Sequence, residues 1–228
     1  MGPKASTVVS APYHHGNLRN TLIAEGRRAL EEIGVHELSL RYLARKAGVS
    51  EAAPSRHFAG KEGLLAAIAA DGFRDLAALR AAISESEETA HSMAYRMMKV
   101  YVEFVQRYKG LFELMVGPRI VARDSYPELS REISASFRLF ASSIEQFALE
   151  KGWEDQSLKL VTHAAWSMEH GLATLILSDR VPSPGLSLSI DKIVEFSISM
   201  LLSAVAAGAS SLEEVMKHID DLRSVSDA

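Results

Sequence analysis

The chain has 228 residues, 47% of them apolar and 24% charged, which is the composition of a globular protein large enough for a sizeable core. It contains no cysteine, and this excludes disulfide bonds, thiolate catalysis and zinc or iron–sulfur sites built on cysteine. Residues 1–62 hold nine Lys and Arg against six Asp and Glu, and the remainder holds sixteen against twenty-three, so a basic amino-terminal part (+3) precedes an acidic body (−7).

The amino-terminal part begins with a predicted tail and one helix. Residues 1–13 contain two prolines and few apolar side chains, and we expect them to form a flexible tail. A helix is predicted from about 17 to 33, because apolar or small residues recur at helical spacing and Gly34 follows them. The face they form contains Leu18, Leu22, Gly26, Ala29, Leu30 and Ile33.

The stretch from 39 to 58, SLRYLARKAGVSEAAPSRHF, has the pattern of two helices joined by a tight turn. Ser39 is a candidate N-cap, and it precedes one apolar face at i, i+3, i+4 and i+7. Gly48 is suited to the left-handed conformation that ends a helix, and Ser50 can cap the next one. The pattern predicts a helix-turn-helix, whose second helix can enter the major groove of DNA; the alternative is an ordinary helical corner in a core.

Further helices are predicted along the rest of the chain. The first starts at Lys61 and fades near 84–88, and the next extends to Tyr108, where Lys109-Gly110 breaks it. A short apolar helix then reaches Gly117-Pro118, and another runs from Pro127 to about 151. Two unusually apolar helices follow at about 155–177 and 188–207, separated by a Pro/Ser/Gly-rich loop at 181–187, and a polar helix is expected at 212–222.

No strand pattern is present, so the predicted fold is all-α. The domain organisation we expect is a helix-turn-helix DNA-binding domain over 14–62, followed by a larger helical body over 63–228.

Residues 14–65 resemble the amino-terminal domain of TetR-family transcriptional regulators. The resemblance rests on SLRYLARKAGVS, on the His57-Phe58 pair, on Lys61-Glu62 after one small residue, and on Leu64–Leu65. It implies a three-helix DNA-reading head and, over 63–228, a helical ligand-binding and dimerisation domain whose last two long helices form a four-helix bundle with a second subunit. We therefore expect a homodimer through 155–177 and 188–207. The alternative is that both helices are simply buried core.

The candidate DNA contacts follow from the second helix of the motif. If Ser50 caps it, its first turns expose residues that can meet base edges or phosphates. Arg56 could bind guanine or a phosphate, and by resemblance Lys61 and Arg41 contact phosphates. One departure from the family is Ser55, where tyrosine is usual, and another is Pro54, which we expect to cost at most one helical hydrogen bond. The full set is Arg41, Ser50, Glu51, Ala52, Ala53, Ser55, Arg56, His57 and Lys61.

A candidate ligand pocket is expected in the body. His163, Trp166, His170 and Thr174 share one helical face, and Trp166 with His170-Gly171 resembles the Trp…His-Gly signature of one TetR subgroup. These side chains could hydrogen-bond a small hydrophobic molecule, or they could satisfy one another in a solid core. In the first case Ala173→Trp should fill the pocket. The expected lining is Met97, Tyr101, Phe104, Met115, Phe140, His163, Trp166 and His170.

Other classes of function find little support in the sequence. It contains no nucleophile elbow, phosphate loop, HExxH or Rossmann pattern, and Glu169-His170 is a poor catalytic dyad because adjacent helical residues point apart. Two histidines seven residues apart without a third ligand do not predict a metal site, and no cofactor is expected. The amino terminus lacks a signal-like apolar run, and no stretch reaches about 18 uninterrupted apolar residues, so we expect a cytoplasmic protein.

The sequence therefore predicts a homodimeric repressor released from a palindromic operator by a small molecule. The alternatives are an architectural or interaction DNA-binding dimer without a ligand, and a helical enzyme.

Overall fold

The computed structural model describes residues 18–117, 121–178 and 189–210. Within these ranges the chain forms α-helices and short 3-10 helices and no β-strand, which confirms the all-α prediction. No helix in the described ranges is both long enough and apolar enough to cross a membrane. The tail predicted at 1–13, the loop at 181–187 and the helix at 212–222 lie outside the described residues.

The head comprises α1 (Leu18–Glu37), α2 (Leu40–Lys46) and a 3-10 helix, η2 (Pro54–Arg56). The helical backbone of α1 is interrupted at Gly34, whose φ of 73° is strained for other residues, and this is the break that the sequence predicts. Ser39 caps α2 by accepting a hydrogen bond from the backbone N–H of Tyr42 (3.2 Å), also as predicted.

The second helix of the predicted motif is shorter than expected. Residues 51–53 form a turn, and only Pro54–Arg56 is helical, with 3-10 geometry. Ala53 precedes η2, and the Ser50 side chain caps no helix in the described ranges. The reason is Pro54, which has no N–H for the carbonyl of Ser50 and whose ring crowds that carbonyl in an α-helix. The Ala53 N–H instead bonds the Ser50 carbonyl three residues back (3.0 Å). The expectation that Pro54 would cost only one hydrogen bond is therefore wrong.

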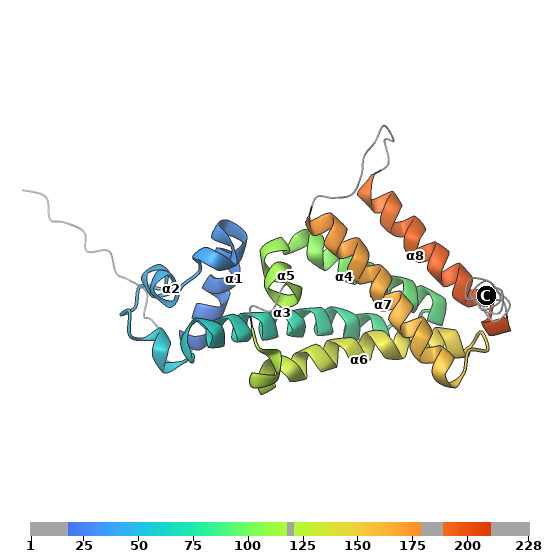
Figure 1. The fold of residues 1–228 in the computed structure, drawn as a ribbon, viewed down its shortest axis with the longest axis horizontal. Coiled ribbons are helices and arrows are strands. Elements are labelled where there is room, and N and C mark those ends of the chain that lie inside the picture. The colour runs from blue at the N-terminus through green and yellow to red at the C-terminus, as the bar shows by residue number, and fades with distance from the viewer. Residues whose placement is uncertain (1–17, 118–120, 179–188, 211–228) are drawn as a thin grey trace, which may run out of the picture.

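Within the described ranges, the body contains one long helix that leaves the head, and α4, α5 and α6 pack against it; α7 packs on α4 and α6, and α8 packs on α4 and α7. Figure 1 shows α3 running from the head along the body, with α6 beside it and α8 at the far end. The elements are α3 (Gly60–Ser84), α4 (Ala90–Arg107), α5 (Lys109–Val116), η3 (Arg123–Ser125), α6 (Pro127–Leu149), α7 (Asp155–Leu177) and α8 (Ile190–Ala206).

The break between α4 and α5 lies one residue earlier than the sequence predicts. Tyr108 leaves the helical conformation (φ −131°, ψ 64°), and Lys109 and Gly110 are the first residues of α5. A carboxylate of the head explains this start, because Glu31 accepts hydrogen bonds from the backbone N–H groups of Gly110 (3.0 Å) and Leu111 (2.9 Å). These are orphan donors of the first turn of α5, and an acidic side chain satisfies them well.

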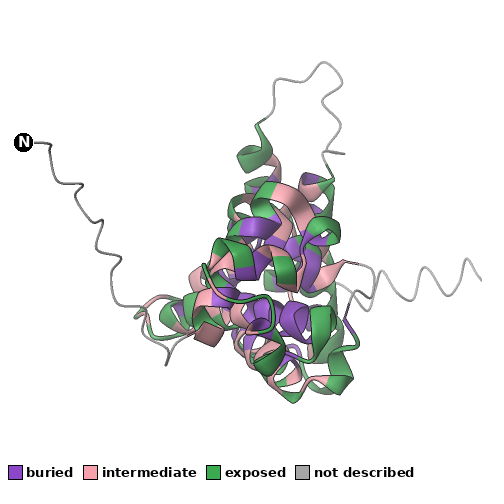
Figure 2. Ribbon diagram, turned by 90° about the vertical axis from the view of Figure 1, so that its left-hand side faces the viewer, coloured by how far each residue is buried: buried purple, intermediate pink, exposed green. Residues whose placement is uncertain are grey.

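Two apolar clusters hold the molecule together, with buried positions on the inner faces of the helices (Figure 2). One joins the head to α3, α5 and part of α4, and includes Leu22, Leu43 and Ile68. The other joins α4, α6, α7 and α8, and includes Met97 and Phe140. The first turns of α3 lie beneath the head, and the same helix continues into the body. The head and the body are therefore joined by one continuous helix. The domain boundary we propose at 62/63 falls within its first turn.

Candidate DNA interface and ligand cavity

The segment between α2 and α3 exposes polar residues to solvent and is held in place by two buried residues. Pro54 and Phe58 are buried, and the Arg19 guanidinium lies over the Phe58 ring at 5.9 Å from its centroid. Of the predicted DNA contacts, Ala53 is half-buried and the others are exposed: Arg41, Ser50, Glu51, Ala52, Ser55, Arg56, His57 and Lys61. The structure thus leaves most of the candidate contacts exposed to solvent, although not on the regular helix expected.

The three candidate cations on this surface differ in what holds them. Arg41 faces Glu51 at 3.5 Å, and Lys61 donates to the backbone carbonyl of His36 (2.8 Å). Arg56 is exposed and makes no ion pair among the described residues. Since all three are exposed, the interactions of Arg41 and Lys61 are weak enough to be exchanged for a phosphate.

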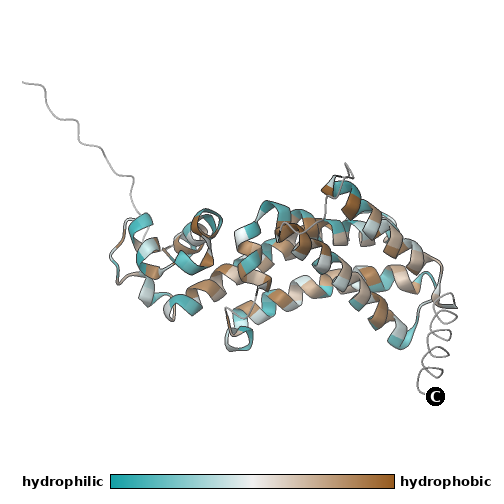
Figure 3. Cartoon of the chain, turned by 45° about the horizontal axis from the view of Figure 1, so that its top comes forward, coloured by the Kyte–Doolittle hydropathy of each residue, from teal (hydrophilic) through white to brown (hydrophobic). Residues whose placement is uncertain are grey.

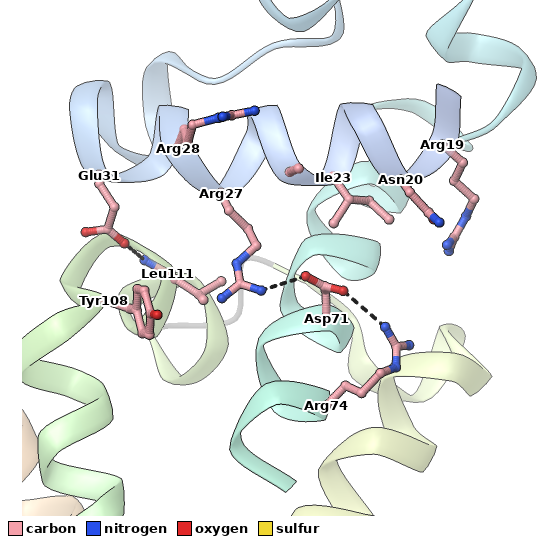
Figure 4. A pocket seen from close by; sticks show the side chains of 11 residues that line it. Arg19, Asn20, Ile23, Arg27, Arg28, Glu31, Asp71, Arg74, Tyr108 and Leu111 are labelled. Carbon is pink, nitrogen blue, oxygen red and sulfur yellow. Dashed lines mark hydrogen bonds and ion pairs between the residues drawn. The ribbon is translucent and has the colours of Figure 1, made fainter. Parts of the chain in front are cut away.

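The junction of head and body is a groove of about 600 Å³ between α1, α3 and α5 (Figure 4). Its charges are matched: Arg27 pairs with Asp71 (2.7 Å) and Asp75 (2.6 Å), and Arg74 pairs with Asp71 (3.1 Å) and Glu128 (2.9 Å). We interpret this groove as the joint between the two parts, because its polar groups already satisfy one another.

A second cavity, of about 430 Å³, lies in the body between α3, α4, α6 and α7, and its lining includes the exposed residues Arg123, His163 and Trp166. It is mostly apolar, yet it includes charged and hydrogen-bonding side chains from five elements. This combination is typical of small-molecule sites. The lining residues are Phe73, Leu76, Arg80, Tyr101, Val116, Arg123, Ile133, Ser136, Phe137, His163, Trp166, Glu169 and His170.

An ion pair buried in the cavity wall joins α3 to α7. Arg80 and Glu169 are 3% and 0% exposed, and their side chains meet at 2.8 Å. Arg80 also donates to the Ser136 backbone carbonyl and hydroxyl, both at 3.1 Å. Arg80 Nε and Glu169 Oε2 are buried and have no hydrogen-bond partner among the described residues. A buried pair of this kind adds little stability, because desolvation offsets most of the attraction, whereas removing one partner is strongly destabilising.

Burial shifts the proton affinities of several groups here. It raises the pKa of Glu169 to about 8, although the Arg80 guanidinium opposes the shift. It also raises the pKa of Tyr101, with Glu169 adding to the effect, and lowers the pKa of His170, with the charge of Arg123 adding to it. The Tyr101 hydroxyl and His170 Nδ1 form a hydrogen bond of 2.9 Å, consistent with a neutral imidazole. Shifts of this kind, gathered in one cavity, favour a functional site.

Four of the eight residues predicted to line a pocket lie on this cavity: Tyr101, His163, Trp166 and His170. The Trp166 and His170 rings stack with their centroids 5.7 Å apart. The other four, Met97, Phe104, Met115 and Phe140, are buried in the two apolar clusters and do not line it.

Two further residues of α7 lie away from the cavity as well. Thr174 is exposed, and Ala173, at 0% exposure, lies in the core, so Ala173→Trp would overpack the core rather than fill the cavity. Sequence reasoning did not assign Arg80, Arg123 or Glu169 to the site. A signal existed for Arg80 and Glu169, because each interrupts an otherwise apolar helical stretch.

The outer faces of α7 and α8 carry large apolar side chains in contact with solvent in the single chain, and Figure 3 shows hydrophobic positions along both helices. Leu160, Phe196 and Met200 are 65%, 69% and 54% exposed, and Leu175 is 45% exposed. A Cβ added at the exposed Gly171 would meet no atom of the described residues within 4 Å. Such a face is unusual on a monomer and typical of an interface.

Comparison with known proteins gives two matches to family models. Residues 22–68 match the model of bacterial regulatory proteins, tetR family, and residues 94–201 match that of the tetracyclin repressor-like C-terminal domain. The two matches cover the head and most of the described body.

Individual proteins resemble the chain over most of its length. The nucleoid occlusion factor SlmA of Idiomarina loihiensis is 27% identical over 167 residues, which are 71% of this chain and 79% of that protein. A protein of unknown function from Rhodococcus sp. RHA1 is 31% identical, with a TM-score of 0.73 over 86% of this chain and 100% of the other. A TetR variant from Acinetobacter baumannii AYE, solved in complex with minocycline, is 17% identical, with a TM-score of 0.58 over 81% and 94% of the two chains, and therefore shares the fold.

Proposed function

Because the chain belongs to the tetR family of bacterial regulatory proteins, we propose that it is a ligand-responsive transcriptional repressor. It binds a palindromic DNA operator as a homodimer in the cytoplasm, and it leaves the operator when a small molecule occupies the cavity. The observation that carries the proposal is the course of α3. Its first turn contains Lys61 of the candidate DNA surface, and Phe73, Leu76 and Arg80 further along it line the cavity.

The head reads DNA through the exposed segment between α2 and α3. Arg56 is free to reach a base edge or a phosphate, while Arg41 and Lys61 exchange their present partners for phosphates. The short side chains of Ala52 and Ala53 allow close approach to a thymine methyl. The charge of only +3 on residues 1–62 is consistent with moderate affinity per head.

The dimer forms through the outer faces of α7 and α8. Leu160, Phe196 and Met200 supply the apolar contact area. A two-fold axis brings the same face of each protomer together, so one patch covers the other. Two heads in a fixed relation then read two half-sites.

The ligand acts by shifting α3 and the segment before α6. This segment is tied to the head, because the Ala122 N–H donates to Glu62 Oε1 in the first turn of α3 (3.0 Å), and Arg123 next to it lines the cavity. A ligand that binds the DNA-free arrangement better than the DNA-bound one releases the operator. Each 1.4 kcal/mol of difference between the two binding free energies shifts the ratio of the two arrangements about tenfold.

The second candidate is a DNA-binding dimer that senses no small molecule. The observation in its favour is the similarity to a nucleoid occlusion factor over 71% of the chain. In this case the cavity would be a packing defect, and the buried ion pair would only fix how α3 meets α7.

The two candidates are separated by challenging the operator complex with the small-molecule fraction of a cell extract. A ligand-responsive repressor dissociates, and the Ile133→Trp variant, which narrows the cavity, stays bound. A matched change outside the cavity, Arg138→Gln, should respond like wild type. If wild type and Ile133→Trp keep the operator equally well in every fraction, the ligand-free function is the correct one.

A further inference from the structure

The charged groups around the cavity do not balance. Its lining contains the cations Arg80 and Arg123 and one acidic residue, Glu169, so the lining is positively charged whether Glu169 is ionised or protonated. An excess positive charge beside a mostly apolar lining favours a ligand of opposite sign.

Of the two cations, Arg123 is the one a ligand can reach. Arg80 is 3% exposed and already bonded to Glu169 and Ser136. Arg123 is exposed, donates one hydrogen bond to the Met115 backbone carbonyl (2.8 Å), and makes no ion pair among the described residues. It also lines a neighbouring polar pocket that contains Glu62 and Asp124. Its charge is nevertheless felt inside the cavity, since it disfavours protonation of His170.

The rest of the lining fits an aromatic or aliphatic body. Phe137 meets Trp166 edge to face, with centroids 6.4 Å apart, and Phe73 and Leu76 of α3 lie on the same cavity. At the polar end, the hydrogen-bonded pair of Tyr101 and His170 offers neutral donors or acceptors beside the charge of Arg123. A cationic ligand would meet the guanidinium group of Arg123 here, and a fully apolar one would leave Arg123 without an ion pair.

We infer that the cavity binds an amphipathic monoanion, an aromatic or aliphatic molecule with one carboxylate that pairs with Arg123 and an apolar body that lies against Phe137 and Trp166. This inference rests on the proposed function and specifies its ligand. The sequence alone suggests a purely apolar molecule, whereas the lining of the cavity favours one that is acidic at one end. Arginine suits this role because its planar guanidinium can bind both oxygens of a carboxylate.

Three probes with one body and three charges test the inference: 6-phenylhexanoate, 6-phenylhexanamide and 6-phenylhexylamine. Titration calorimetry on the full chain should rank them acid, amide, amine, with the acid at least about tenfold tighter than the amide. In Arg123→Gln the acid should fall to the level of the amide, whose affinity should not change. The exposed Arg138 does not line the cavity, so Arg138→Gln is the matched control and should keep the wild-type ranking.

Tryptophan emission locates the probe. The chain has two tryptophans, and Trp153→Phe leaves Trp166 on the cavity as the only one. The acid should shift the Trp166 emission with the affinity found by calorimetry.

The outcomes separate this inference from the proposed function. If the amide or the amine binds as tightly as the acid, or if Arg123→Gln keeps the preference for the acid, the monoanion is refuted while the cavity remains a ligand site. If none of the three probes releases heat or changes the Trp166 emission up to its solubility limit, the monoanion is refuted, and the challenge with cell-extract fractions alone decides whether the proposed function stands.

Discussion

Replacing Gly110 with alanine would place a methyl group where α5 crosses the backbone of α1. Its Cβ would lie 2.4 Å from the Leu30 carbonyl oxygen and 2.7 Å from the Leu30 carbonyl carbon. Backbone atoms cannot move aside as a side-chain tip can, so α5 must shift away from α1 by several tenths of an ångström. The shift would also lengthen the hydrogen bonds that Glu31 accepts from the first turn of α5.

The cost follows from these two effects. Overpacking of a tight contact costs about 1–3 kcal/mol, and weakening a helix cap costs about 1 kcal/mol. The higher helix propensity of alanine than of glycine offsets up to about 1 kcal/mol of this loss. The net loss in free energy of unfolding should therefore be about 2 kcal/mol. Because the head rests on α5 here, operator affinity should fall as well.

Gly72→Ala is the matched control. It too is a helical glycine at a helix crossing, but its Cβ would meet the Met115 sulfur at 2.7 Å, the flexible end of a side chain. We expect its stability to stay within about 1 kcal/mol of wild type. Urea denaturation of both variants and operator binding by fluorescence anisotropy provide the measurements. Equal stability of the two variants would show that the contact between α1 and α5 is not the rigid joint described here.

Three further predictions concern DNA, the dimer and pH. Lys61→Ala should weaken binding to all DNA sequences and reduce the salt dependence of the binding constant by about one phosphate contact. Arg56→Ala should cost about 1–3 kcal/mol of binding free energy and relax the base preference at one position of the operator. If Arg56→Ala instead weakens binding equally for all sequences, Arg56 is a phosphate contact. Phe196→Glu should give monomers in analytical ultracentrifugation, and an unchanged dimer would remove α8 from the interface. Burial raises the pKa of Glu169 from 4.5 to about 8 in a site that it shares with Arg80, Tyr101 and His170. The folded state therefore favours the protonated carboxyl group. The stability that this group contributes is complete below pH 4.5 and declines by up to about 1 kcal/mol per pH unit until pH 8. Denaturation of Glu169→Gln from pH 4 to 9 should lack this decline, and curves parallel to wild type would contradict it.

The helices of the body were predictable because their ends carry local signals. Pro127 opens α6, Gly152 with its φ of 79° follows it, and α7 spans the predicted 155–177. The segment after Ser50 was harder, since a proline can sit in the first turn of an α-helix or convert that turn to 3-10 geometry. Which occurs depends on how Pro54 and Phe58 pack under the head, and this is tertiary information.

The candidate site was only half visible in the sequence. Trp166 and His170 share a face of one helix, and periodicity alone brings them together. The pair of Arg80 and Glu169 joins residues 89 positions apart on different helices, and Arg123 follows a loop, so no local pattern connects them. Charged residues are usually solvated, and their burial is decided by how α3 and α7 cross.

Selection of bound sequences from a random DNA pool by the full-length chain tests the central claim most directly. The account predicts a palindrome whose two half-sites are centred about one helical turn apart, or a small multiple of it, because two heads related by the α7–α8 axis must each meet the major groove. Enrichment of a single unrepeated half-site, or of no sequence at all, would contradict a dimeric operator-binding regulator.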